Sequence, residues 1–177
     1  DKDAVADIDT NLQRPAPSGA GDSALDALLS LDAIAVPLEA RTRGKVITAM
    51  CELAASTGLL WDPEKMADAV GAREALAPTA LDSGVALLHP RRPQPSILAE
   101  AVLALGITSA GIPFGGSGNL TDIFFLIAAT SDQEHLRILA RLSRVINDLD
   151  WIESLRQARG RSEARALILE RDAEVVA

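Results

Sequence analysis

The feature that most constrains the fold is an uninterrupted apolar run, Ile123-Phe-Phe-Leu-Ile-Ala-Ala129. Both faces of a strand formed by these residues are apolar, so both must be covered by other elements. A second short run, Val85 to Leu88, opens after Gly84 and also reads as a buried strand bounded by turn residues. The two runs favour an α/β fold with a mixed central sheet and helices packed on both faces.

Two helices are predicted before these strands. A helix is predicted over residues 43–56, because the apolar positions there recur at helical spacing, and Thr42 is expected to cap it. Asp62 is expected to cap a second helix over residues 63–76, with Pro63 at the first helical position. Earlier in the chain, residues 25–31 are helix-like, and Ile34-Ala-Val36 is a candidate short strand.

Three more helices are predicted after the apolar run. Asp132 is expected to cap the longest helix, which runs to about Leu149. Asp150 is expected to start a short helix, and Ser162 to cap the last one. The apolar face of the long helix is predicted at Leu136, Leu139, Leu142, Val145, Ile146 and Leu149.

The chain has 177 residues, enough for one domain. Residues 1–24 are acidic and rich in Pro and Gly, so we expect a linker or tail there that adds little to the core. The folded domain is expected over residues 25–177. Residues 1–32 carry seven Asp against Lys2 and Arg14, and the whole chain has a formal charge of −8. This charge argues against direct binding of nucleic acid.

Composition disfavours several other classes. Cys51 is the only cysteine, so no internal disulfide can form and a cytoplasmic location is expected. No apolar run reaches about 18 residues, so no membrane span is predicted. The two histidines lack metal-ligand spacing. Gly115-Gly-Ser-Gly118 reads as a turn, because it precedes a strand and lacks the Gly-Lys-Ser/Thr ending of a phosphate-binding P-loop.

His89 is the first candidate for chemistry. It ends the second apolar run, Pro90 and Pro93 stop the strand, and Arg91 and Arg92 follow it closely. A neutral imidazole beside guanidinium groups suits a nucleophile that accepts a phosphoryl group. The ordinary histidine pKa of about 6.5 leaves one ring nitrogen unprotonated at neutral pH. The alternative is a histidine that is merely exposed on a surface loop.

The segment around this histidine resembles a known signature, Gly-Ile-Ala-x-Pro-His-x-(Arg/Lys). It reads Gly84-Val-Ala-Leu-Leu-His89-x-Arg91. The signature belongs to the type 2 enzyme IIA domains, the fructose/mannitol/nitrogen-regulatory class of the bacterial phosphoenolpyruvate-dependent phosphotransferase system. Leu88 stands where that family has Pro, and Pro90 follows the histidine instead.

Other residues keep the same register, over roughly residues 34–170. Arg73-Glu74 lies sixteen positions before His89, where the family has Arg-Glu, and Thr79 is also in register. The resemblance implies that His89 is phosphorylated and that the sheet has about five strands. It also favours a strand within residues 97–108, where apolar spacing alone looks helical.

His135 is the second candidate. It lies in the first turn of a predicted helix, and a helix N-terminus favours an anion. It could therefore donate a hydrogen bond to a phosphoryl group on His89, and the resemblance implies a second active-site histidine at Glu134-His135-Leu136. We expect the two rings to face each other across one shallow pocket. The alternative is a partly buried histidine beside Leu139.

Arginines and hydroxyls complete the predicted site. Arg73 is a candidate clamp, because a guanidinium binds phosphate bidentately. Arg91 and Arg92 are further phosphate-binding candidates, and Thr79 and Ser83 could donate hydroxyl hydrogen bonds. For the arginines, the alternative is a solvated surface position.

Two functions follow as hypotheses. The first is a phosphocarrier that takes a phosphoryl group on His89 from HPr or a nitrogen-branch HPr relative. Its onward partner would be a permease IIB domain or a regulatory target, and neither a cofactor nor a metal is required. The second is a regulatory module, tethered by its acidic start to an upstream domain, that controls a partner through its phosphorylation state.

Overall fold

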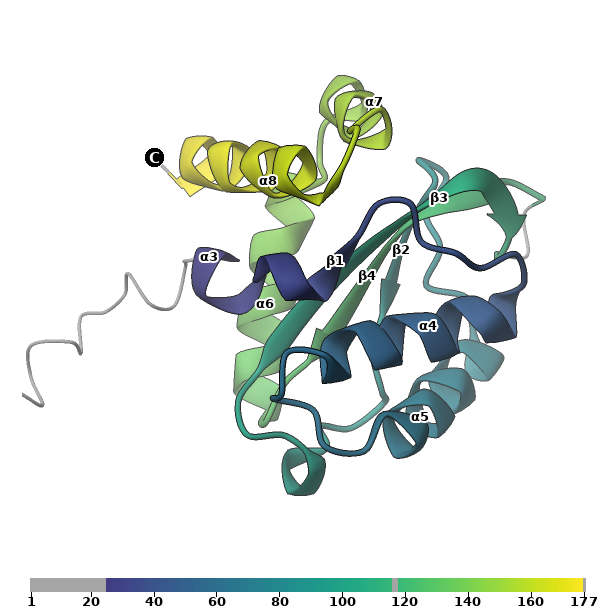
Figure 1. Cartoon of the computed structure of the whole chain (residues 1–177), viewed down its shortest axis with the longest axis vertical. Helices are drawn as coiled ribbons and strands as arrows, with labels where there is room; N and C mark the ends of the chain where they lie inside the picture. Colours follow the sequence, from purple (N-terminus) through teal and green to yellow (C-terminus); the bar gives the residue numbers. More distant parts are fainter. Residues whose placement is uncertain (1–24, 116–117, 177) are drawn as a thin grey trace, which may run out of the picture.

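The computed structural model describes residues 25–115 and 118–176 (Figure 1). In this part of the chain the strands form one mixed sheet in the order β1-β3-β4-β2. β3 and β4 are antiparallel, whereas β1 is parallel to β3 and β2 is parallel to β4. The mixed sheet is confirmed, with four described strands in place of the five or so expected. They are β1 (Ile34–Ala35), β2 (Val85–Leu88), β3 (Val102–Pro113) and β4 (Leu120–Ala128).

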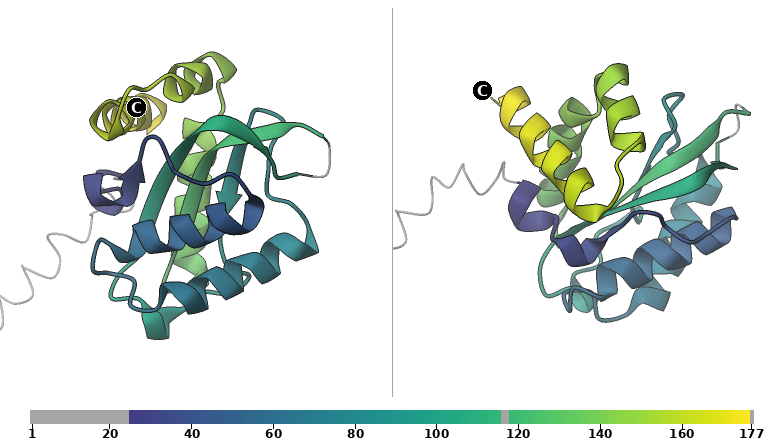
Figure 2. Two further views of the ribbon diagram at one scale, coloured as in Figure 1. Left: turned by 45° about the vertical axis from the view of Figure 1, so that its right-hand side comes forward. Right: turned by 45° about the horizontal axis from the view of Figure 1, so that its top comes forward.

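Helices cover both faces of this sheet (Figure 2). One face carries α4 (Arg43–Ala55) and α5 (Pro63–Leu76). Short 3₁₀ turns, Leu31–Ala33 and Pro95–Ile97, lie in the connections. The other face carries α3 (Leu25–Leu28), α6 (Asp132–Val145), α7 (Leu149–Arg156) and α8 (Arg161–Val176).

The apolar run in β4 explains the two layers. Alternate side chains point to opposite faces of a strand. Ile123, Phe125 and Ile127 therefore enter the core beneath α6 and α8, while Phe124 and Leu126 enter the core beneath α4 and α5. All five are fully buried. The prediction of a strand covered on both faces is confirmed.

Both early helices begin where the sequence predicts. The Thr42 side chain accepts a hydrogen bond from the Lys45 N–H at 3.2 Å, and Asp62 accepts one from the Lys65 N–H at 3.0 Å. Each bond satisfies an amide that lacks a partner within the first helical turn. Pro63 occupies the first turn of α5, where its missing N–H costs nothing.

The ambiguous segment at residues 97–108 becomes a strand from Val102 onward. Residues 95–97 form a 3₁₀ turn, so the helical spacing is misleading here. β3 then bulges: Ile107 pairs with Ile123 and Ile112 pairs with Thr121, so residues 108–111 lie opposite Asp122 alone. Such a bulge bends a strand and locally disrupts its ladder.

The predicted ends of the long helix are wrong. Its N-cap is Ser131, not Asp132: the Ser131 hydroxyl accepts from the Glu134 N–H at 3.1 Å. The helix stops at Val145, because Asp148 then caps α7 by accepting from the Asp150 N–H at 2.9 Å. Within the described residues the longest helix is α8, with 16 residues against 14 in α6.

The predicted apolar face of that helix is also partly wrong. Leu136 and Leu149 are 62% and 72% exposed, whereas Ile138 and Arg141 are buried. α6 packs against the sheet on one side and against α8 on the other, so its buried surface is not one simple stripe. Arg141 is buried because it pairs with Asp172 of α8.

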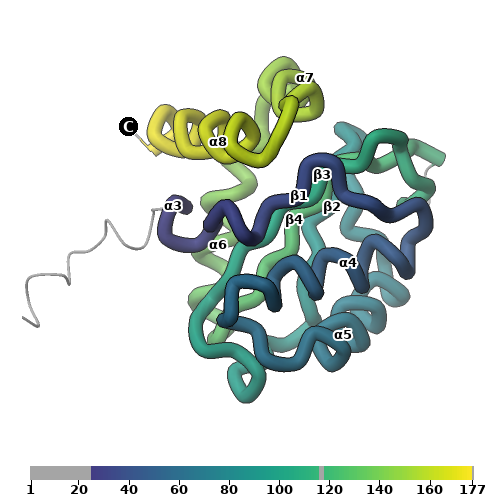
Figure 3. Tube along the Cα trace, in the orientation of Figure 1, coloured from purple at the N-terminus to yellow at the C-terminus, as the bar shows by residue number. Residues whose placement is uncertain are grey.

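The start of the described chain lies beside its end (Figure 3). The Leu25 N–H donates to Asp172 Oδ2 at 3.3 Å, which fixes α3 against α8. α8 begins at Arg161, one residue before Ser162, the predicted cap. The tail predicted over residues 1–24 lies outside the described residues.

Candidate active site

His89 lies where β2 leaves the sheet, and one backbone contact fixes its ring. Its Nδ1 lies 3.0 Å from the carbonyl oxygen of Leu87. A carbonyl can only accept a hydrogen bond, so Nδ1 carries the proton and donates it. Nε2 therefore keeps its lone pair and is the ring nitrogen that can act as an acceptor or nucleophile. This carbonyl therefore sets the tautomer of the His89 ring.

The replacement of the signature's Pro by Leu88 has a local explanation. Leu88 is fully buried and pairs with Leu126, so it is an ordinary residue of the β2–β4 ladder. Pro90, itself buried, follows His89 and cannot donate to a ladder. The strand therefore extends to Leu88. In the family signature a Pro precedes the histidine, whereas in this chain Pro90 follows the histidine and ends the strand.

His135 faces His89 from the start of α6. The two ring centroids are 4.8 Å apart, with the ring planes tilted by 43°. Both histidines are half-buried. His135 also lines a small pocket together with Pro90, Arg91 and Asp132. The predicted approach of the two rings is confirmed; the chemical roles assigned to them remain predictions.

The surroundings keep both rings neutral. Burial lowers the pKa of His89 below its usual value, and the positive charge of Arg73 lowers it further. The hydrogen bond to Leu87 and the negative charge of Glu74 oppose this shift. Burial also lowers the pKa of His135, and the neighbouring His89 lowers it further, whereas the negative charge of Asp132 raises it. Each ring therefore offers one donor and one acceptor nitrogen at neutral pH.

Arg73 and Thr79 are both held by neighbouring groups. The Arg73 Nη1 donates to the Ala77 carbonyl at 2.7 Å, at the C-terminal end of α5. The Thr79 hydroxyl donates to the Glu74 carboxylate, and the Thr79 N–H donates to Glu74 Oε2 at 3.2 Å. A hydroxyl has one proton, so Thr79 has none left for a phosphoryl oxygen in this state.

The comparison with known families is decisive here. Residues 27–171 match the family described as "Phosphoenolpyruvate-dependent sugar phosphotransferase system, EIIA 2". The chain belongs to this family. The match spans most of the described residues, including His89 and His135.

Solved structures of enzyme IIA domains share this fold. The IIA mannitol structure from Escherichia coli has a TM-score of 0.70 and 22% sequence identity, covering 78% of this chain and 97% of that one. The nitrogen regulatory protein IIA-Ntr from Neisseria meningitidis has a TM-score of 0.70 and 23% identity, covering 80% and 97%.

Curated relatives are longer proteins. The chain is 33% identical over 105 residues to the multiphosphoryl transfer protein of Salmonella typhimurium, and 36% identical over 99 residues to that of Vibrio cholerae. These matches cover 58% and 54% of this chain. They cover only 27% and 24% of the two relatives.

The remaining predicted site residues of this enzyme IIA domain lie in different places. Arg91 lines the pocket that contains His135. Arg92 is exposed, and its carbonyl accepts from Gln94 Nε2 at 3.3 Å. The structure places Arg91 in the same pocket as His135 and shows no such contact for Arg92 in the described residues.

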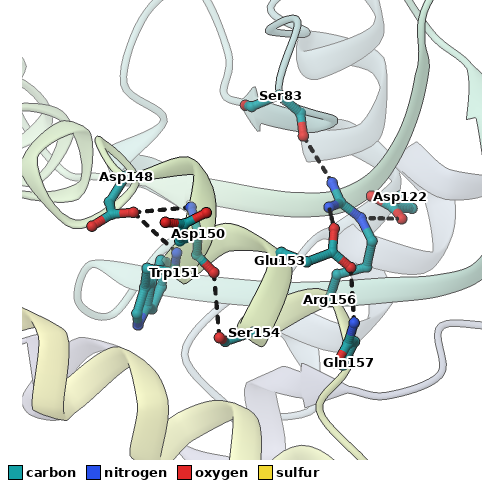
Figure 4. Close-up of polar contacts among 9 residues, drawn as sticks. All are labelled: Ser83, Asp122, Asp148, Asp150, Trp151, Glu153, Ser154, Arg156 and Gln157. Carbon is teal, nitrogen blue, oxygen red and sulfur yellow. Dashed lines mark hydrogen bonds and ion pairs between the residues drawn. The ribbon is translucent and has the colours of Figure 1, made fainter.

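Ser83 is not brought to the histidines. It precedes β2 whereas His89 follows it, so the strand alone separates them by about 13 Å. The Ser83 carbonyl instead accepts from Arg156 Nη2 at 2.8 Å, and Arg156 Nε donates to Asp122 at 2.6 Å (Figure 4). The next residue, Gly84, has φ of 93°, and a Cβ there would lie 2.5 Å from Arg156 Nη2. The positive φ favours glycine there, and the absence of a Cβ leaves room for the guanidinium.

Sequence reasoning gave no role to two residues beside the site. Glu74 is 1% exposed. The Arg43 Nη2 donates to the Glu74 carbonyl at 2.9 Å and lies 3.7 Å from its carboxylate, while the guanidinium sits 5.4 Å from the Phe114 ring centroid. The one sequence feature that could have pointed to Glu74 is the Arg73-Glu74 pair, which matches the family's Arg-Glu. No sequence feature points to Arg43.

A larger cavity, of about 820 Å³, lies away from the histidines between residues 38–45 and the bulge at 109–112. It is lined by neither histidine. Across the described ranges, no group of three or more His, Cys, Asp or Glu side chains is placed to hold a metal ion. None of the described helices has the length and apolar character needed to cross a bilayer.

Proposed function

We propose that this chain is a histidine phosphocarrier that accepts a phosphoryl group on Nε2 of His89. The observation that carries the proposal is the paired geometry of the site. His89 has its Nδ1 proton engaged by Leu87, and its ring faces His135 at 4.8 Å. Membership of the enzyme IIA family supports the same chemistry.

The transfer needs little beyond positioning. The Nε2 lone pair of His89 forms a bond to phosphorus as the phosphorus–nitrogen bond of a donor phosphohistidine breaks, and the donor imidazole leaves with that electron pair. The Nδ1 proton stays on His89, where the Leu87 carbonyl stabilises the positive charge that develops on the ring. His135 donates its N–H to a phosphoryl oxygen. Such in-line transfer draws its rate from orientation and electrostatics.

Replacing His135 with Ala should slow transfer without abolishing it. The variant loses one donor to a charged phosphoryl oxygen, which is worth about 1.5–3 kcal/mol. We expect acceptance to slow about ten- to a hundredfold in single-turnover labelling. His135→Gln keeps an amide donor and is expected to lie between the variant and the wild type. Complete loss of label on His89 in both variants would contradict the assigned role.

The rate of acceptance should depend on pH through His89. The ring accepts only when Nε2 is unprotonated, and burial with Arg73 lowers its pKa below the ordinary 6.5 or so. Between about pH 8 and about pH 5, the rate is therefore expected to fall with its midpoint below the ordinary histidine value of about 6.5. Single-turnover labelling across this range, with the donor's own pH dependence measured in parallel, checks the result. A midpoint at or above that ordinary value would contradict it.

The partners follow from the family. We propose HPr or a nitrogen-branch relative as donor, and cytoplasm as the compartment where the two meet. A IIB domain is the proposed acceptor, because one similar structure is the complex of IIA mannitol with phosphorylated IIB mannitol from Escherichia coli. Incubation with phosphoenolpyruvate, enzyme I and either HPr type, followed by an offered IIB domain, tests donor and acceptor separately.

A regulatory role is the second candidate. It is supported by the similarity to IIA-Ntr and by relatives in which the matching segment is about a quarter of a longer protein. Phosphorylation of His89 would then change the binding of a partner rather than feed a permease. A chain that takes label from the nitrogen-branch donor, but passes none to any IIB domain, would favour this role.

A further inference from the structure

Glu74 is a buried carboxylate in an unfavourable place. It is 1% exposed and lies in the last turn of α5. The C-terminal end of a helix carries partial negative charge, so a carboxylate there is destabilised. Burial of a charge is costly unless it is paired and hydrogen-bonded. Helix stability therefore does not explain why an acid occupies this position.

The contacts of Glu74 organise the turn that follows α5. Its carboxylate accepts from the N–H of Thr79, at 3.2 Å, and from the Thr79 hydroxyl. The chain then runs antiparallel to β2, with Ala80 bridged to Ala86. Glu74 thus closes the turn at residues 77–79. The chain after this turn runs beside β2, the strand that leads to His89.

The same turn holds Arg73. The carbonyl that accepts from the Arg73 guanidinium belongs to Ala77, within the turn. The positive charge of Arg73 lowers the pKa of His89, which links the turn to the imidazole. Any change that opens the turn therefore displaces Arg73, whose positive charge lowers the pKa of His89.

The charge of Glu74 acts against that of Arg73. The charged and titratable groups around His89 are Arg73 and Glu74 from α5, and Asp132 and His135 from α6, with Arg91 in the following loop. Among the groups that act on His89, Glu74 is the one that adds negative charge. A phosphoryl group brings a further charge of about −1.5 to −2, so the carboxylate repels it.

We propose that Glu74 is a positioning residue of this site: it holds the turn that places Arg73, and its charge limits how strongly His89 retains a phosphoryl group. The inference rests on the proposed function for its biological meaning. Its physical content, however, concerns the imidazole and its phosphorylated form, which can both be studied without a protein donor.

The first test is the titration of His89 by NMR in the unphosphorylated chain. Glu74→Gln keeps the shape and removes the charge, so the pKa of His89 is expected to fall below that of the wild type. Thr79→Val keeps the charge of Glu74 but loosens the turn that holds Arg73, so the pKa of His89 is expected to stay at the wild-type value or to rise, opposite in direction to Glu74→Gln. Arg43→Gln exposes His89 to an uncompensated carboxylate and should shift the pKa upward. Arg43 is 42% exposed, so this variant should fold even if Glu74→Gln does not.

The second test is the lifetime of phosphohistidine made chemically with phosphoramidate. Here the phosphorus–nitrogen bond of phosphoramidate breaks, ammonia leaves, and a bond to Nε2 forms. Glu74→Gln is expected to slow the loss of label about three- to tenfold, the effect of removing one repulsive charge. Thr79→Val should instead slow labelling about fivefold by loosening the turn, with Thr79→Ser restoring the wild-type rate.

The outcomes separate the inference from the proposed function. If the chain takes label from phosphoramidate but none from any HPr-type donor, the phosphocarrier proposal fails. The lifetimes of the phosphohistidine would still test the role of Glu74. Equal titrations and lifetimes in wild type and Glu74→Gln would overturn the inference. So would a Thr79→Val variant that matches Glu74→Gln in both measurements, because the residue would then be structural only.

Discussion

The variant His89→Ala is expected to take no phosphoryl label from phosphoenolpyruvate, enzyme I and an HPr-type donor, whereas the wild type should gain one acid-labile, base-stable group. The reason is that the proposed nucleophile is Nε2 of His89, whose other ring nitrogen is hydrogen-bonded to the Leu87 carbonyl. His135 faces it, and the proposed mechanism assigns that ring the role of donor to the phosphoryl oxygens. Label should be measured by intact mass and located by NMR on Nε2.

Three results would contradict this expectation. Label on His135 in the wild type would show that the pocket is correct and the roles are reversed. Label on Nδ1 of His89 would show that the Leu87 contact does not set the tautomer. No label in folded wild type from any HPr-type donor would defeat the carrier proposal. The control is His135→Ala, which should still take label on His89, only more slowly.

The layered fold was predictable because the decisive signals are local. The apolar run at 123–129 needs cover on both faces, whatever the rest of the chain does. Thr42 and Asp62 cap their helices through bonds to residues three positions on, which a short window of sequence contains. His89 was recognisable because its signature is continuous.

The errors arise where distant residues decide. The apolar face predicted for the long helix leaves out Arg141, which is buried because it pairs with Asp172, thirty-one residues later. The exposure of Leu136 likewise depends on where α8 packs, which periodicity within α6 does not contain. Ser83 was grouped with His89 by nearness in sequence, although an extended strand separates its two ends. Glu74 gains a role only once Thr79 folds back onto it.

Asp172→Ala is expected to destabilise the fold by about 3–5 kcal/mol, because it leaves the buried guanidinium of Arg141 without its partner. Asp172 Oδ2 lies 3.1 Å from Arg141 Nη2 and also accepts from the Leu25 N–H. The variant therefore loosens α3, α6 and α8 together. Urea unfolding followed by circular dichroism measures the loss.

The matched control lies on the same helix. Glu174 is 61% exposed and is 3.9 Å from Arg171, so Glu174→Ala should cost less than about 1 kcal/mol. A small loss in Asp172→Ala, comparable to the control, would show that Arg141 finds water or another partner when the pair is broken. At temperatures where it is folded, the Asp172→Ala variant should still take label on His89. The Arg141–Asp172 pair lies between α6 and α8, whereas His135 lies in the first turn of α6. Stability and phosphoryl acceptance are then separable, since α6 serves the core through Arg141 and the site through His135.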